Sequence, residues 1–236
     1  MHEIAKAELL RTLGGLVRGL STLFWGLGLT GLVCLGTVYL ETAQTFWRET
    51  SAALAFAPAL LPSPLLWHGL RRLRSFQAQE RIWQRALNRA EILAVLDAGL
   101  APFLFWCHRF PAVPLYQACV GLLFVSSLFL LIQINWVLQR LSAMLPDETL
   151  RAETKLFTGF NTSLLLAFLA GLSAYFVLTL LPPSLLPVWM DRWMEAATAA
   201  GVWLALFLML MPLAMTMALL WKIKEVIFSS LTNAER

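Results

Sequence analysis

The order of charged and uncharged residues along the chain constrains the fold more than any other feature. Long runs of residues carry almost no charge, and clusters of arginine and lysine separate them. Only 14% of the 236 residues are charged, whereas a soluble domain has about 25%. A helix of about 20 apolar residues crosses the roughly 30 Å of a bilayer core. The pattern therefore predicts an all-α, polytopic membrane helix bundle that forms one integral membrane domain over residues 1–236.

Six transmembrane helices account for the apolar runs. They are expected at residues 19–40, 51–70, 92–107, 112–139, 156–181 and 196–221. Three prolines, Pro58, Pro62 and Pro64, predict a kink in the second span, and the third is short. Residues 1–18, 71–91 and 146–155 have the pattern of amphipathic cytoplasmic segments. The middle one suits a helix on the membrane surface or an extension of a membrane helix.

The positive charges orient these helices. With the amino terminus in the cytoplasm, all of the 18 lysines and arginines except Arg48, Arg109 and Arg192 fall in cytoplasmic segments. Cytoplasmic loops of membrane proteins are enriched in these residues. We therefore expect both termini in the cytoplasm and a location in the cytoplasmic (inner) membrane of a bacterial cell. The net charge of +4 then reflects topology, and no nucleic-acid partner is expected.

A short motif recurs before three of the spans. Lys6-Ala7-Glu8, Arg89-Ala90-Glu91 and Arg151-Ala152-Glu153 precede the first, third and fifth. The chain can therefore be interpreted as three helical hairpins, each opened by a cytoplasmic helical segment. Because these residue types all favour helices, convergence explains the triplets better than a true internal repeat.

Asp97 is the only carboxylate well inside a predicted span. A charge at mid-bilayer costs roughly 2.5–3.5 kcal/mol on insertion scales, so such a residue needs an explanation. The topology places other polar side chains at a similar depth near the cytoplasmic side: His68, Gln133, Asn135 and Asn161. We expect Asp97 to face the bundle interior, within reach of Asn135 or Asn161.

Two interpretations of this polar layer are open. It lines a cavity open to the cytoplasm, in which Asp97 accepts a proton or a cation, or its side chains join neighbouring helices through hydrogen bonds. A complete translocation path would continue toward the outer side, where the spans are almost wholly apolar. The structural interpretation is therefore favoured.

Small residues predict where helices pack closely. They recur every four residues in the fifth and sixth spans, at Gly159, Ser163, Ala167 and Gly171, and at Ala197, Gly201 and Ala205. The spacing leaves open whether the partner helix belongs to this chain or to another. A separate cluster of Arg71, Arg72 and Arg74 could hold an anionic lipid head group, although a topogenic role is the commoner one.

The sequence contains no pattern typical of an enzyme. Its three histidines fall in different layers, and no zinc or nucleotide-binding motif occurs. We expect no catalytic residues, no metal and no cofactor. The leading hypothesis is a non-enzymatic membrane subunit or scaffold of a larger assembly, transport or export assemblies among them, with a protein partner or as a homo-oligomer. The alternative is a self-sufficient small-solute or proton-coupled transporter that uses Asp97 and the polar layer.

Overall fold

Every regular element in the described part of the chain is a helix. The structure, a computed structural model, describes residues 2–42, 60–77, 79–145, 147–180 and 188–234, with side chains for 11–36, 60–77, 79–145, 147–174, 204 and 206–229. The helices are α1 (His2–Thr42), α4 (Pro62–Leu73), α5 (Arg81–Leu100), α6 (Pro102–Arg109), α7 (Pro114–Met144), α8 (Glu148–Leu180) and α9 (Val188–Ala234).

Among the described residues, five stretches are long and apolar enough to cross a membrane. They are Arg11–Gly36, Arg81–Arg109, Pro114–Met144, Glu148–Ala174 and Leu206–Ser229. The prediction of an all-α, multi-pass helix bundle is thus confirmed. The predicted second span falls partly on residues 51–59, which lie outside the described residues. Its described part, α4, has 12 residues and a length of about 18 Å, too short to cross a membrane alone.

The predicted amphipathic segments are mostly continuous with membrane helices. α1 has no break near residue 18, α8 begins at Glu148, and residues 81–91 form the first half of α5. Residues 74–77, 79 and 80 belong to the turn between α4 and α5, where Gln77 adopts a φ of 50°. The predicted third span, residues 92–107, covers the end of α5 and most of α6. These two helices are separate because a proline at position 102 interrupts the pattern of helical hydrogen bonds.

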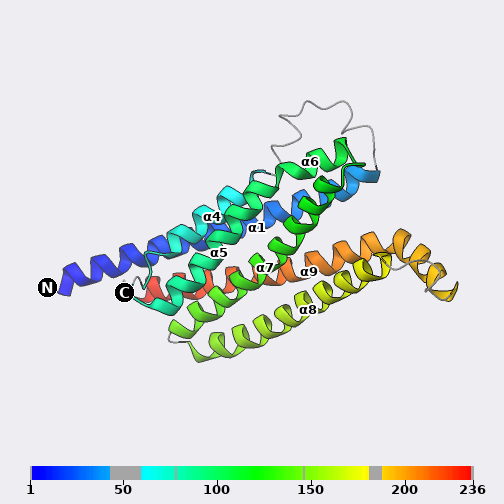
Figure 1. Ribbon diagram of the computed structural model, residues 1–236. Coiled ribbons are helices and arrows are strands. Elements are labelled where there is room, and N and C mark those ends of the chain that lie inside the picture. Colours follow the sequence, from blue (N-terminus) through cyan, green and yellow to red (C-terminus); the bar gives the residue numbers. More distant parts are fainter. Residues whose placement is uncertain (1, 43–59, 78, 146, 181–187, 235–236) are drawn as a thin grey trace.

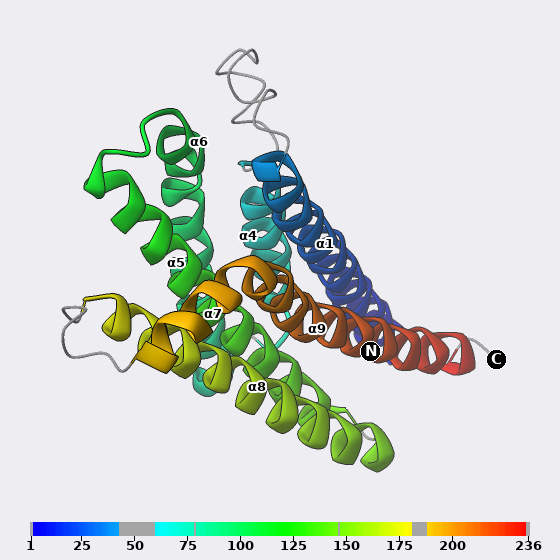
Figure 2. The same cartoon turned by 90° about the vertical axis from the view of Figure 1, so that its right-hand side faces the viewer.

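The helices form a closed ring. α1 packs against α4, α4 against α5, α5 against α7, α7 against α8, α8 against α9 and α9 against α1, and α7 also contacts α9 across the ring. α1 begins and α9 ends at the same end of the bundle, and α6 lies toward the other end (Figure 1). We call these the terminal end and the opposite end. Figure 2 shows α9 between α1 and α8.

The half of the ring near the terminal end is a close-packed apolar core. Leucines of α1, α4 and α5 surround the fully buried Trp83, and leucines and isoleucines of α7 and α9 continue the same cluster: Leu16, Leu20, Leu70, Leu73, Leu87, Leu138, Leu141, Ile223 and Ile227. Each of these side chains exposes 1% of its surface or less. This half therefore holds the helices in place.

Polar contacts join the helices at the terminal end. Glu80 at the start of α5 pairs with Arg140 of α7, and Glu153 of α8 pairs with Lys222 of α9. Arg74, directly after α4, bonds to Gln84 and Asn88 and pairs with Glu91, all three on α5. Because these pairs are partly exposed to solvent, they fix helix positions more than they add stability.

Glycines bring α1 and α4 into close contact. A Cβ atom added at Gly26 would lie 2.9 Å from Cδ2 of Leu66, and one at Gly69 would lie 2.8 Å from Cγ of Leu23. Carbon atoms do not approach so closely without a shift, so glycine alone fits there. The contact between α1 and α9 is also close: a Cβ at Gly31 would lie 2.8 Å from Cδ2 of Leu213, the end of a flexible side chain, which would have to shift.

The predicted small-residue face of α8 has no partner helix among the described residues. Gly159, Ser163, Ala167 and Gly171 are all exposed. A Cβ added at Gly159 or Gly171 would have nothing within 4 Å. Close packing by small residues therefore occurs on α1 and α4 within this chain. The side chains of Ala197, Gly201 and Ala205 lie outside the described residues.

Candidate functional site

A cavity of about 490 Å³ lies inside the ring of helices. All of α1, α4, α5, α6, α7, α8 and α9 contribute to its wall, chiefly through residues 27–34, 62–66, 120–134 and 206–213. On α1, α4, α7 and α9 the close-packed core follows directly on the terminal side, with Leu23, Leu70, Leu138 and Leu220. The cavity therefore occupies the half of the bundle away from the termini.

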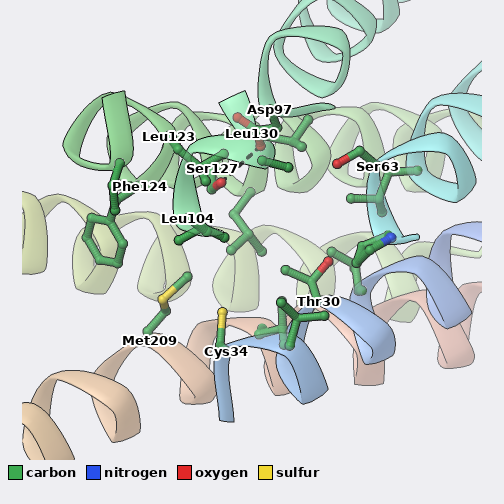
Figure 3. Close-up of a pocket in the computed structure, with 18 of the residues that line it drawn as sticks. Thr30, Cys34, Ser63, Asp97, Leu104, Leu123, Phe124, Ser127, Leu130 and Met209 are labelled. Carbon is green, nitrogen blue, oxygen red and sulfur yellow. Dashed lines mark hydrogen bonds between the residues drawn. The ribbon is translucent and has the colours of Figure 1, made fainter. Parts of the chain in front are cut away.

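The cavity wall is mostly apolar and has a few polar groups. Leucine, isoleucine, valine, alanine, proline, methionine and phenylalanine make up most of the lining, and the polar residues are Thr30, Cys34, Ser63, Asp97 and Ser127. Figure 3 shows Asp97 and Ser127 on one wall, with Thr30 and Cys34 across the cavity from them. A volume of this size and a lining of this kind are typical of small-molecule sites, which range from about 300 to 1,000 Å³.

Asp97 is buried, with 6% of its surface exposed. The Ser126 hydroxyl donates a hydrogen bond to its Oδ1, and the Ser127 hydroxyl donates one to its Oδ2 at 3.0 Å. Both serines belong to α7, so these bonds join α5 to α7. The prediction that Asp97 faces the bundle interior is confirmed.

The predicted partners of Asp97 form a separate cluster. Asn135 Nδ2 donates to Thr216 Oγ1 at 3.0 Å, and Asn161 Nδ2 lies 2.9 Å from the same oxygen and 3.2 Å from Asn135 Oδ1. All three residues expose 1% of their surface or less. Asn161 Nδ2 also donates to the Pro212 carbonyl at 3.1 Å. The cluster thus joins α7, α8 and α9.

The prediction that Asp97 lies within reach of Asn135 or Asn161 was therefore wrong. Ser126 and Asn135 are nine residues apart on α7, which separates their levels by about 13 Å. The sequence gives the depth of each side chain only along its own helix, and the register between helices comes from packing. The polar layer expected from the sequence is consequently two groups. One lines the cavity, and the other closes it on the terminal side.

The two remaining members of the predicted layer are placed differently again. His68 is exposed on α4. Gln133 of α7 is half-buried, and its Oε1 atom has no hydrogen-bond partner among the described residues. Neither residue lines the cavity. The structure thus separates both from the carboxylate with which the sequence grouped them.

The arginine cluster divides in the same way. Arg71 and Arg72 are exposed, and the Arg71 guanidinium lies 4.7 Å from the centre of the Trp67 ring. Arg74 has its three partners on α5, as described above. Arg74 therefore links α4 to α5, a role that its place in the sequence does not reveal. Lipid binding by the cluster stays a prediction.

Three hydroxyl residues belong to these groups and were not predicted. Ser126 and Ser127 form an adjacent polar pair in the middle of an apolar span, and Thr216 follows Pro212 by one helical turn. An adjacent serine pair in an apolar span is a detectable signal, because polar side chains in membrane helices tend to form hydrogen bonds with neighbouring helices. Two buried threonines of α8, Thr154 and Thr158, continue the polar side of that helix toward the terminal end.

No group of three or more histidine, cysteine, aspartate or glutamate side chains converges in the part of the chain that the structure describes. The chemistry available at the cavity is therefore that of one carboxylate, several hydroxyls, one thiol and a thioether. These groups can bind a ligand and exchange a proton. No protein family, curated protein or solved structure matches the chain, so the functional conclusion depends on this site alone.

Proposed function

We propose that the protein is a membrane carrier for a small solute, with the cavity as its binding site and Asp97 as the charged group of that site. The observation behind this proposal is the position of a buried carboxylate on the wall of a cavity that every described helix helps to form. A residue that only joined helices would not need an adjoining cavity. The carrier performs no covalent chemistry and needs no cofactor.

The arrangement of the ring supports a carrier. The close-packed core and the Asn135–Asn161–Thr216 cluster close the cavity on the terminal side. A site that is closed toward one side of the membrane can exchange solute with the other side. Transport then requires a second state in which the terminal side opens. The partly exposed ion pairs at that end contribute little stability each, so they do not prevent such opening.

The terminal end faces the cytoplasm in this proposal. Among the residues that the structure describes, most lysines and arginines belong to helical segments near this end (Figure 1), as the positive-inside rule predicts for a cytoplasmic face. Arg71 and Arg72 then lie at the cytoplasmic surface, where anionic lipid head groups attract them. The proposed topology has six spans in a bacterial cytoplasmic membrane, with both termini on the cytoplasmic side.

Thiol labelling tests the carrier. A chain in which serine replaces the three native cysteines receives one new cysteine on the cavity wall, Ser63→Cys, or a matched one in the close-packed half, Ser142→Cys. Ser63 and Ser142 are both buried, and only Ser63 lines the cavity. We expect a membrane-impermeant maleimide to modify the Ser63→Cys chain from the outside and, more slowly, from the cytoplasm. If both chains resist the maleimide equally from both sides of the membrane, the result contradicts the carrier proposal.

A second candidate function is a membrane subunit or scaffold of a larger assembly. The exposed small-residue face of α8, defined by Gly159, Ser163, Ala167 and Gly171, supports it, because such faces let helices of different chains approach closely. Oxidative cross-linking of Ala167→Cys in native membranes tests whether a second copy lies there. Ser173→Cys, exposed on another face of α8, is the control. If neither position cross-links and the protein is a monomer in mild detergent, the result counts against a role as a subunit of a larger assembly.

A further inference from the structure

The cavity wall, as far as the structure describes it, has one carboxylate and no positively charged side chain. Among the described residues of the lining, Asp97 is the only charged one. In the described part of the chain no lysine or arginine forms an ion pair with it, and its hydrogen bonds come from Ser126 and Ser127 alone. Burial of an ionised carboxylate is costly unless a positive charge neutralises it. The described side chains supply no such charge here.

The serine hydroxyls orient the carboxylate and leave it able to accept further hydrogen bonds. Ser126 bonds to one oxygen and Ser127 to the other. A carboxylate offers about four lone-pair positions, so both oxygens can accept a further bond from a donor in the cavity. Ser127 lines the cavity beside Asp97, whereas Ser126 is not part of the lining. Asp97 and Ser127 therefore lie together on the cavity wall, where a donor in the cavity can approach the carboxylate (Figure 3).

The apolar side chains of the lining determine which ligands fit beside Asp97. Leu104, Leu123 and Leu130 extend from the wall that holds Asp97, and Phe124 and Met209 lie further along the cavity (Figure 3). Phe124 packs edge-on against Phe168, with 5.7 Å between the ring centres, and both rings line the cavity. Aromatic rings and thioethers accept apolar groups, and aromatic faces also attract cations.

We infer that the cavity binds a lipophilic monocation, an organic amine whose protonated nitrogen bonds to Asp97 while its apolar body lies against the leucine and phenylalanine walls. The inference deepens the proposed carrier function and rests on it. A dication would leave one charge without a partner, because no second acid occurs among the described residues of the lining. An anion would meet Asp97 without a compensating positive charge.

Three compounds with the same rigid hydrocarbon cage test this inference. Adamantylamine is a cation at neutral pH, adamantanol is neutral and adamantanecarboxylate is an anion. Their affinities for the purified, detergent-solubilised full chain follow from the rise in its unfolding temperature with ligand concentration. We expect the amine to bind at least about tenfold more tightly than the alcohol, because a charge-assisted hydrogen bond replaces a neutral one. We expect no detectable binding of the carboxylate.

Two variants localise the effect. In Asp97→Asn the amide fills the same space, and the preference for the amine over the alcohol should fall to less than about twofold. In Leu104→Trp the larger ring occupies the cavity, and binding of both compounds should weaken. If Asp97→Asn does not fold, the comparison of amine with alcohol on the unaltered protein still decides the matter.

The outcomes separate this inference from the carrier proposal. Equal affinity for amine and alcohol would overturn the inference, and so would an amine preference that survives Asp97→Asn. The carrier would stand in both cases if the alcohol binds, Leu104→Trp weakens its binding, and the cysteine at position 63 is modified. If none of the three compounds binds and the Ser63→Cys chain also resists the maleimide, both proposals fail.

Discussion

Asn161 and Asp97 are both buried polar residues inside membrane helices, but their surroundings differ. Asn161 has protein atoms on all sides: it bonds to Asn135, Thr216 and the Pro212 carbonyl, and no part of its cluster lines the cavity. Asp97 has protein on one side and the cavity on the other. Polarity inside a membrane therefore does not identify a function. The presence of space beside the polar group distinguishes a site from a structural contact.

The difference extends to the two halves of the ring. In the terminal half the core side chains are fully buried, and Gly19 of α1 and Gly69 of α4 lie directly against leucines. In the opposite half a cavity takes the place of that core. Substitutions of similar size should consequently have different effects in the two halves, and the predictions that follow test this.

The largest expected effect is at Asn161. Asn161→Leu removes the amide that three partners share and takes the donor away from the buried Oδ1 of Asn135, while Thr216 keeps its bonds to Asn135 and to the Pro212 carbonyl. An unsatisfied buried polar group costs about 1–3 kcal/mol, so we expect a loss of about 2–3 kcal/mol in the free energy of unfolding. SDS titration of the protein in detergent micelles, followed by tryptophan fluorescence, measures it. Ser163→Leu, an exposed position on the same helix, should change it little. Equal losses in the two variants would remove the structural role assigned to the Asn161 cluster.

The next largest effect is at Gly26. Gly26→Ala places a methyl group 2.9 Å from Cδ2 of Leu66 and 3.3 Å from its backbone nitrogen, so α1 and α4 must separate. Overpacking of this kind costs about 1–3 kcal/mol. The same titration on Gly14→Ala gives the control, since a methyl group there meets nothing within 4 Å and alanine favours the helix. A stable Gly26→Ala protein would mean that the two helices are not held as closely as described.

A smaller effect distinguishes the cavity from the core on a single helix. Leu123→Phe adds volume beside the cavity, and we expect it to cost less than about 0.5 kcal/mol. Leu128→Phe adds the same volume where the side chain is 0% exposed, and we expect a loss of about 1 kcal/mol or more. Thermal unfolding of both variants in one detergent provides the comparison. The reverse order would argue that the cavity is filled by side chains in solution.

The smallest effect is a pH dependence at the terminal end. Asp147 Oδ1 accepts bonds from the hydroxyl and N–H of Thr149 and from the N–H of Leu150. These bonds hold the pKa of Asp147 below its usual value, and the bond from the Thr149 hydroxyl has the largest effect. A carboxylate with a lowered pKa stabilises the folded state above its unfolded pKa of about 4, and loses this contribution as the pH falls through its folded pKa.

Asp147→Ala should therefore lower the unfolding temperature at neutral pH and have a smaller effect below about pH 3. Asp147→Asn keeps a side-chain oxygen at the start of α8, since asparagine is also a good cap, and it cannot ionise. The difference in unfolding temperature between the Asp147→Asn and Asp147→Ala variants should stay the same over this pH range. A wild-type advantage over Ala that persisted unchanged in acid would show that ionisation of Asp147 has no part in capping α8.

The sequence predicted the features that depend on one helix at a time. The apolar runs gave the multi-pass helical bundle, and the cost of a charge in the membrane gave the buried position of Asp97. It could not give the register between helices, which decides that Asp97 meets Ser126 and Ser127 and that Asn135 meets Thr216. Register arises from contacts among side chains distant in the chain, and no spacing within one segment encodes it.

The small-residue faces show the same limit. A spacing of four places Gly159, Ser163, Ala167 and Gly171 on one face of α8, and the structure agrees that they share an environment. That environment is exposed, whereas the glycines in contact with other helices are on α1 and α4. Periodicity identifies a face but not what the face meets. The cavity is harder still to predict, because it depends on seven helices together.

The contact between α1 and α9 has a consequence for the order in which the protein assembles in the membrane. These are the first and last helices of the described chain, and Gly28 and Gly31 of α1 meet Met217 and Leu213 of α9. During synthesis α1 inserts first and can pair with α4, but this face of α1 stays against lipid until α9 is made. The same late step brings Thr216 to the two asparagines and Leu213 and Met209 to the cavity wall. The wall of the cavity is therefore incomplete until α9 has been made.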